Sequence, residues 1–156
     1  MNTRTALLQT YCLSLLQGAR AWRRLADEEV KAFGLSEATA YPLVFMTRLG
    51  DGIRQSALAD AIGIEGPSLV RLLDQLCAAG LIERREDASD RRAKTLHFTT
   101  YGRDVTASLS EALDRRRSRT FAHVSTSDLE AAIRVLSVLD EAPSEDRAPS
   151  LGRAIA

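Results

Sequence analysis

The sequence is poor in lysine, aromatic residues and cysteine, and it has no excess charge of either sign. Lys31 and Lys94 are the only lysines among 156 residues, aromatic residues make up 5%, and the formal net charge is zero. A chain without net charge does not attract nucleic acid through its overall field, so any such site needs a local cluster of arginines. The few aromatic residues imply a core built mainly from leucine, alanine, valine and isoleucine.

The two cysteines, Cys12 and Cys77, lie far apart in the sequence and give no disulfide framework. This usage is typical of a reducing compartment. No apolar run is long enough to span a bilayer, and the N-terminus lacks the basic start and apolar run of a signal peptide. We therefore expect a cytoplasmic protein with one core and no membrane partner.

The residues needed for catalysis or metal binding are also scarce. His97 and His123 have no carboxylate or thiolate at the spacing of metal ligands, and no set of nucleophile, base and orienting group is apparent. We expect neither an enzyme nor a bound cofactor or metal.

The first 50 residues predict two helices. One covers about 5–33, where no proline interrupts apolar residues at helical spacing: Leu8, Tyr11, Leu15, Trp22 and Leu25. Ser36 is the expected N-cap of a second helix, which ends at Gly50. We expect a kink or local bend at Pro42 in that helix, because proline removes one backbone hydrogen bond.

Residues 51–98 predict short elements in the order of a winged helix-turn-helix. A helix over 55–62 precedes a second helix over 67–79, with Gly66 as its cap and Pro67 at its first position. Two strands, 81–85 and 95–98, then form a hairpin around a polar loop.

Two more helices are expected after this lobe. Thr99 is the predicted cap of a long helix to about residue 124, whose first turn Gly102 weakens. Ser125 and Asp128 resemble a capping box for a last helix, whose apolar face carries Leu129, Ile133 and Leu136.

The expected fold class is therefore mainly α (α+β), with three regions. Residues 1–50 and 99–142 form a helical dimerisation region, because a small domain would not bury all of its apolar stripes unless they were shared across a two-fold axis. Residues 51–98 form the winged lobe. Residues 143–156, rich in proline, serine and charge, are interpreted as a flexible tail.

The helix over 67–79 has a polar face suited to DNA. Leucines at helical spacing mark its buried face, and Ser68, Arg71 and Gln75 fall on the opposite one. Arginine can donate two hydrogen bonds to a guanine edge, and serine or glutamine can contact bases or phosphates. Any amphipathic surface helix has a polar face, however, so this helix alone leaves the choice open.

The hairpin loop adds a cluster of basic residues, namely Arg84, Arg85, Arg91, Arg92 and Lys94. An arginine at the tip of such a hairpin suits the narrow, negative minor groove. We expect Asp90 to hold a neighbouring arginine through a fork-shaped pairing. A solvated loop with self-compensating charges is the alternative, but helix and loop together favour DNA binding.

Three stretches resemble the MarR family of bacterial regulators, especially its SlyA branch: Gln55 to Leu76, Gly80 to Arg85, and Ala88 to Lys94. The resemblance implies an obligate homodimer whose first and last helices interleave. It also implies Pro67, Ser68 and Arg71 at the groove, a wing in which Asp90 and Arg92 match a paired Asp and Arg of the family, and Arg91 as a further wing arginine of the SlyA branch. Pro42 and the long tail depart from the family pattern.

From these observations we expect a transcription regulator, more often a repressor in this family, that binds a palindromic operator in double-stranded DNA. The two recognition helices of a dimer would meet half-sites roughly 34 Å apart. The candidate DNA contacts are Ser56, Pro67, Ser68, Arg71, Gln75, Arg84, Asp90, Arg91, Arg92 and Lys94.

A small aromatic acid is a possible effector, since members of the family often bind one between the helical arm and the DNA-binding lobe. Trp22, Tyr41, Phe45 and Met46 are expected at this junction. The carboxylate of the aromatic acid could pair with one of three arginines, Arg20, Arg23 or Arg24. Plain core packing of the aromatics, with solvated arginines, is the alternative.

Two other functions remain open. Zero net charge favours a winged-helix module that binds proteins instead of DNA. A thiol-based redox regulator would act through Cys12, which lies where some peroxide-sensing family members place a reactive cysteine, although its neighbours Tyr11 and Leu13 offer no obvious activation. The basic run from Arg115 to Arg119 spreads around a helix and is interpreted as a solvated face, with phosphate contact or steering as the alternative.

Overall fold

The computed structural model describes residues 3–90 and 92–140. The chain divides into two compact units, Met1–Arg119 and Thr120–Ala156. Helices dominate and a small antiparallel sheet accompanies them, which confirms the expected fold class. No helix in the described part of the chain combines the length and apolarity needed to cross a membrane.

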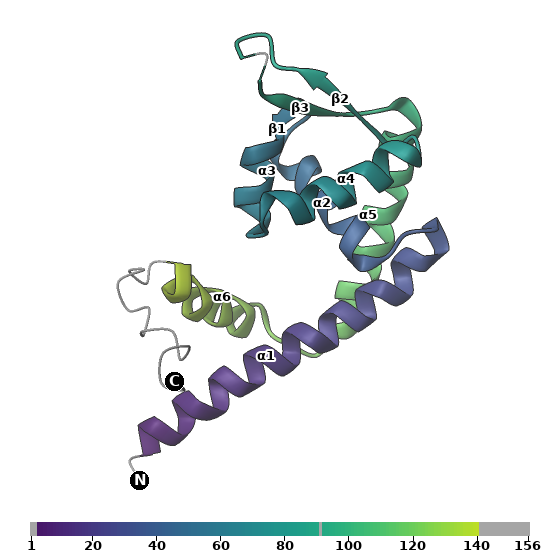
Figure 1. Ribbon diagram of the computed structural model, residues 1–156. Helices are drawn as coiled ribbons and strands as arrows, with labels where there is room; N and C mark the ends of the chain where they lie inside the picture. Colours follow the sequence, from purple (N-terminus) through teal and green to yellow (C-terminus); the bar gives the residue numbers. More distant parts are fainter. Residues whose placement is uncertain (1–2, 91, 141–156) are drawn as a thin grey trace, which may run out of the picture. The chain divides into compact units, whose positions relative to one another are not determined.

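Two helices open the first unit (Figure 1). Helix α1 spans Thr3–Val30, and a 3₁₀ turn, η1, Lys31–Phe33, extends it to Gly34, which adopts a left-handed conformation with φ 70°. Helix α2 spans Glu37–Leu49 and begins with a reciprocal cap between Ser36 and Thr39. It stays helical on both sides of Pro42, which is buried.

The winged lobe contains two helices and three strands, in the order β1 Ile53–Arg54, α3 Gln55–Ile62, α4 Gly66–Ala78, β2 Ile82–Glu86 and β3 Lys94–Phe98. Both bounds of α3 agree with the sequence prediction. The N-cap of α4 differs from the prediction: Glu65 is the N-cap, and Gly66, the predicted cap, is the first residue of the helix. Strand β1 was not predicted, since two residues are too few to show a strand period.

The sheet is antiparallel throughout, with β3 between β1 and β2. Leu96 at the centre of β3 pairs with Ile53 on one side and Arg84 on the other. Figure 1 shows the β2–β3 hairpin extending past the helices of the lobe. The wing loop therefore projects from a sheet whose central strand, β3, is paired on both sides.

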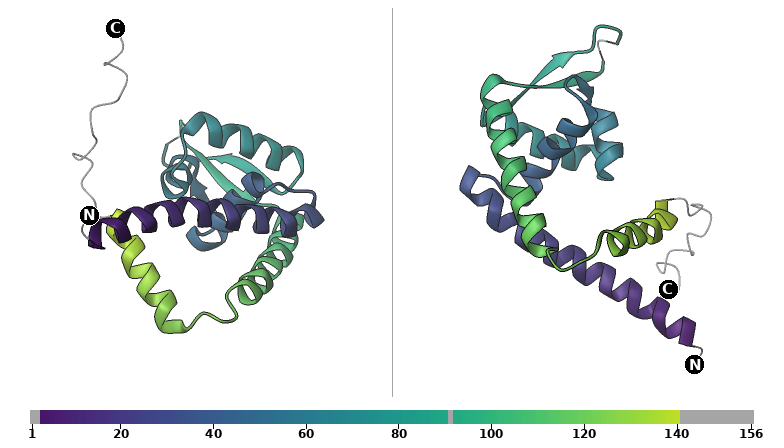
Figure 2. Two further views of the ribbon diagram at one scale, coloured as in Figure 1. Left: turned by 90° about the horizontal axis from the view of Figure 1, so that it is seen from below. Right: turned by 180° about the vertical axis from the view of Figure 1, so that it is seen from behind.

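Helix α5 spans Thr100–Thr120 and ends before the predicted residue 124. Thr99 is its cap, as expected, and accepts a hydrogen bond from the Gly102 N–H at 2.8 Å. Figure 2 shows α5 running from the sheet to α1. There Arg116 and Arg119 donate to Glu29 of α1, at 2.7 and 2.9 Å, so part of the basic run joins two helices and is not simply a solvated face.

Leucine side chains form most of the core, as the low aromatic content implied. Fully buried side chains come from α1, α2, the winged lobe and α5: Val30, Pro42, Leu43, Met46, Leu58, Leu69, Leu73, Leu76, Ile82, Leu96, Thr106 and Leu109. The core thus holds α4 and the sheet against α2, which fixes the direction in which the polar face of α4 points.

Asp51, which lies just before β1, bonds to the end of β3 and to the first turn of α5. Its carboxylate accepts hydrogen bonds from the Phe98 N–H at 2.8 Å and from the Arg103 guanidinium at 3.0 Å. Partial burial opposes ionisation, but these two donors, with His97 nearby, hold the pKa of Asp51 below its usual value.

The second unit contains helix α6, Thr126–Asp140. Ser125 accepts a hydrogen bond from the Asp128 N–H at 3.1 Å, which is the expected cap. The predicted apolar face, Leu129, Ile133 and Leu136, is exposed within this unit. The predicted tail, 143–156, lies outside the described residues.

Candidate nucleic-acid interface

Helix α4 turns its polar face to solvent. Leu69, Leu73 and Leu76 are buried and Leu72 is half-buried, while four residues predicted to contact DNA are exposed: Pro67, Ser68, Arg71 and Gln75. The positive end of the helix dipole lies beside Pro67 and Ser68 and favours a nearby phosphate. Val70, 37% exposed, is an apolar residue on the edge of this face that the sequence analysis did not single out.

Arg84 of β2 holds α4 against the sheet. Its guanidinium forms a salt bridge with Asp74 and donates to the Val70 carbonyl at 3.2 Å, and its side chain is 26% exposed. These bonds fix α4 relative to the wing. A direct contact of Arg84 with DNA, which the sequence analysis included, stays a prediction.

The wing loop is built around carboxylates. Asp90 accepts a hydrogen bond from the backbone N–H of Arg92 at 3.0 Å, and its fork-shaped pairing with a neighbouring arginine stays a prediction. Arg54 of β1 donates to Asp87 at 2.7 Å and to the Ser89 hydroxyl at 2.9 Å. The bond between Arg54 and Asp87 was not predicted from the sequence, and Arg91 lies outside the described residues.

A notch separates the wing from the start of α3. Its volume is about 320 Å³, and its lining includes Ser56, Asp90, Arg92 and Lys94, four of the predicted DNA contacts. Lys94 also forms a salt bridge with Glu86 at 3.4 Å. A hydroxyl, two cations and the first turn of a helix around one notch suit a phosphate group, while the carboxylate of Asp90 opposes one.

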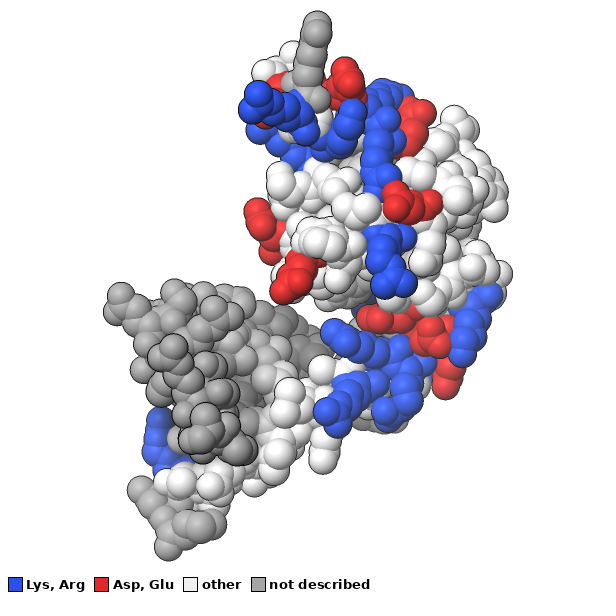
Figure 3. Space-filling view, viewed as in Figure 1, with Lys and Arg blue, Asp and Glu red and all other residues white. Residues whose placement is uncertain are grey.

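Charges of both signs mix over the wing (Figure 3). Pairs such as Arg85 with Glu83 and Lys94 with Glu86 cancel charge locally, which explains how a basic loop coexists with zero net charge. The salt bridges found among the described residues include neither Arg71 nor Arg92. Both residues are exposed, and their contact with DNA stays a prediction.

Known proteins share this architecture. Residues 33–93 match the model of the MarR family. The solved structure of the transcriptional regulator PA3341 is 32% identical, with a TM-score of 0.74 over 85% of this chain and 99% of that one. The chain belongs to the MarR family. It is accordingly a winged-helix transcription regulator.

Two further solved structures share this fold. The transcriptional repressor CouR, solved bound to a 23-mer DNA duplex, is 23% identical with a TM-score of 0.76, over 90% of this chain and 99% of that one. S. aureus MepR in its DNA-binding conformation is 23% identical with a TM-score of 0.75, over 84% and 96%. At this identity the likeness shows the fold alone.

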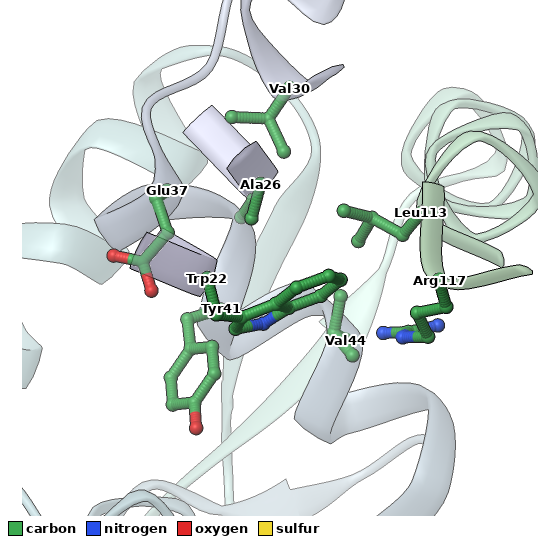
Figure 4. A pocket seen from close by; sticks show the side chains of 9 residues that line it. Trp22, Ala26, Val30, Glu37, Tyr41, Val44, Leu113 and Arg117 are labelled. Carbon is green, nitrogen blue, oxygen red and sulfur yellow. The ribbon is translucent and has the colours of Figure 1, made fainter. Parts of the chain in front are cut away.

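In this MarR-family chain, α1, α2 and α5 enclose a small crevice of about 50 Å³ (Figure 4). Trp22 and Tyr41, both predicted, line it. Glu37 and Arg117, which the sequence analysis did not place there, also line it, and the Arg117 guanidinium lies 5.9 Å from the centre of the Trp22 ring. Arg117 belongs to a basic run whose pattern alone did not indicate a pocket.

The other predicted pocket residues have different surroundings. Phe45 packs against Tyr41 with ring centroids 4.9 Å apart, Met46 is fully buried in the core, and Arg20 is exposed on α1. Arg23 lines an adjoining groove of about 270 Å³ that also contains Tyr41, Glu37 and Leu72 of α4. The predicted set is therefore divided between a crevice, a groove and the core.

The two cysteines differ in accessibility. Cys12 is exposed on α1 and Cys77 is half-buried near the end of α4. Burial raises the pKa of the Cys77 thiol, and its proximity to Asp74 adds to this while Arg84 opposes it, which leaves little reactive thiolate. Within 3–90 and 92–140, no group of three or more His, Cys, Asp or Glu residues is arranged to hold a metal ion.

Proposed function

We propose that this protein represses transcription by binding a palindromic operator as a homodimer. Helix α4 enters the major groove with Ser68 and Arg71 toward base edges, and the wing reaches the adjacent minor groove. The observation that carries the proposal is the exposed polar face of α4, together with a notch that Ser56 and Arg92 both line.

Exposed apolar faces support a dimer. In the first half of α1, Leu7 and Leu13 are 65% and 61% exposed, and in α6, Ile133 and Val138 are each 63% exposed. Apolar faces of this extent are usually interaction sites, and two copies related by a two-fold axis would bury both helices against their partners. Sedimentation of the full chain should give a dimer, and L13E combined with I133E should give a monomer.

The DNA proposal is tested by binding to duplexes. An operator is first selected from a random duplex library with the purified protein, and affinity is then measured between about 50 and 200 mM salt, a range over which several phosphate contacts weaken binding by orders of magnitude. A protein-interaction module would show no specific duplex binding at any salt. Transcription in vitro from a promoter that contains the selected site then separates repression from activation.

A small aromatic acid is proposed as effector, at the crevice of Trp22 and the adjoining groove of Tyr41. Arg117 lines the crevice and Arg23 lines the groove. Each already pairs with a carboxylate, Arg117 with Asp114 and Arg23 with Glu37, so the effector's carboxylate would compete for these cations. A volume of about 50 Å³ is too small for an aromatic ring, so binding must widen the crevice. The groove shares Tyr41 and Glu37 with the crevice, and Leu72 of α4 also lines it. A ligand that favours a form with a wider crevice and groove would therefore shift the position of α4.

A further inference from the structure

Asp87 is the centre of the hydrogen-bond network in the wing loop. One carboxylate oxygen, Oδ1, accepts from the Ser89 N–H, the Ser89 hydroxyl and the Asp90 N–H, at 2.7, 2.6 and 3.2 Å. The other, Oδ2, accepts from Nε of Arg54 at 2.7 Å. Bonds from Arg54 and Ser89 hold the pKa of Asp87 far below its usual range, so it stays ionised at every physiological pH.

Arg54 connects this network to the helix-turn-helix. It lies in β1, directly before α3, and its second donor reaches the Ser89 hydroxyl at 2.9 Å. Because β1 pairs with β3 at Arg54 and Thr95, the root of the arginine is fixed by the sheet. Arg54 therefore ties the wing loop to the strand that leads into α3.

The network continues from Asp87 toward the notch. The Asp87 N–H donates to the Ala93 carbonyl at 3.1 Å, and the Ala93 N–H donates to the Asp90 carbonyl at 2.9 Å, which closes the loop. Asp90, held by Asp87, accepts from the Arg92 N–H at 3.0 Å. The backbone position of Arg92 is thus fixed, through two carboxylates, relative to Arg54.

We propose that Arg54 and Asp87 are positioning residues for DNA binding, which hold the wing so that Arg92 meets the DNA backbone beside α3. This inference rests on the proposed DNA-binding function. It assigns to a negatively charged residue, Asp87, a favourable role in binding a polyanion. Arg54 then acts mainly through the wing and only secondarily through its own charge.

The rival explanation is that Arg54, whose side chain is 48% exposed, contacts a phosphate directly and Asp87 only competes for it. The two explanations predict opposite effects of D87N. Removing a negative charge near DNA should by itself strengthen binding, because phosphate affinity rises with local positive charge. If Asp87 positions the wing, D87N instead weakens binding although the protein becomes more basic.

The experiment measures operator affinity against salt for wild type, D87N, R92A and the double variant D87N/R92A. D60N is the matched control, because it removes the same charge from an exposed carboxylate of α3. We expect D87N to weaken binding about tenfold, as for the loss of one charge-assisted contact. Like R92A, it should also reduce the slope of log affinity against log salt concentration by about one. The double variant should be no weaker than R92A alone, and D60N should bind at least as tightly as wild type.

Three readouts decide the outcome. The positioning role predicts that D87N unfolds at nearly the same temperature as wild type. It also predicts faster hydrogen exchange at the amides of Ser89 and Asp90, which would show that the effect lies in the wing. Wild-type affinity in D87N, or additive losses in the double variant, overturns the positioning role while the DNA-binding function stands. Absence of specific duplex binding by the wild-type chain overturns both.

Discussion

A β-carbon on Gly102 would lie 1.8 Å from the carbonyl oxygen of Leu81. The first turn of α5 therefore packs directly on the backbone that leads into β2. Thr99 strengthens the same junction, since its hydroxyl donates to the Gly80 carbonyl at 2.6 Å. By sequence, Gly102 is only a weak point in a helix, but in the fold it allows α5 to approach the winged lobe.

Replacing Gly102 with alanine should destabilise the protein. Alanine favours a helix by about 1 kcal/mol over glycine, but a contact of 1.8 Å with backbone forces a shift that costs roughly 1–3 kcal/mol or more, so the steric term outweighs the propensity. Denaturant unfolding of G102A measures the difference. G18A is the control, because nothing lies within 4 Å of a β-carbon at that helical position, and it should be neutral or slightly stabilising.

Replacing Arg71 with alanine should reduce operator affinity and relax preference at one base pair. The expected loss is about 1–3 kcal/mol for the removal of two donors to a base edge. Binding to operators with each base changed in turn identifies the position. R115A is the control, because it removes an equal charge from α5 and should leave operator affinity unchanged. If R71A instead loses the same affinity for every operator sequence, Arg71 is a phosphate contact.

Acid should weaken the fold through Asp51. Its pKa is lowered in the folded protein, so its contribution to stability is complete above the ordinary value of 3.8 and is lost as pH falls through the lower folded value. D51N should therefore unfold more easily than wild type at pH 7, and the difference should shrink as pH approaches 3. Thermal unfolding between these pH values measures this. An equal difference at all pH values would mean that the charge of Asp51 contributes nothing.

Trp22 is the only tryptophan in the chain and lines the crevice, so its fluorescence reports on ligands there. Titration with salicylate as probe should change this fluorescence and lower operator affinity. R117L should weaken the probe's binding through loss of its cation, while R115L, two residues earlier on α5, should not. Binding of the probe without any change at Trp22 would place the effector elsewhere.

The sequence determined the features that depend on neighbours along the chain. Ser36 and Gly50 placed α2, Gln55 to Ile62 matched α3, and leucine spacing in α4 predicted which face would be buried. These signals are short-range, because caps and amphipathic stripes act within a few residues.

Tertiary structure decided which charged groups pair. The wing offers several acids to several arginines, and no spacing rule selects Asp87 for Arg54, 33 residues away, or Asp74 for Arg84. Strand β1 exists only because β3 supplies its hydrogen-bond partners, and that pairing brings Arg54 to the wing. Partner choice depends on distances through space, which the chain acquires only once its core has packed.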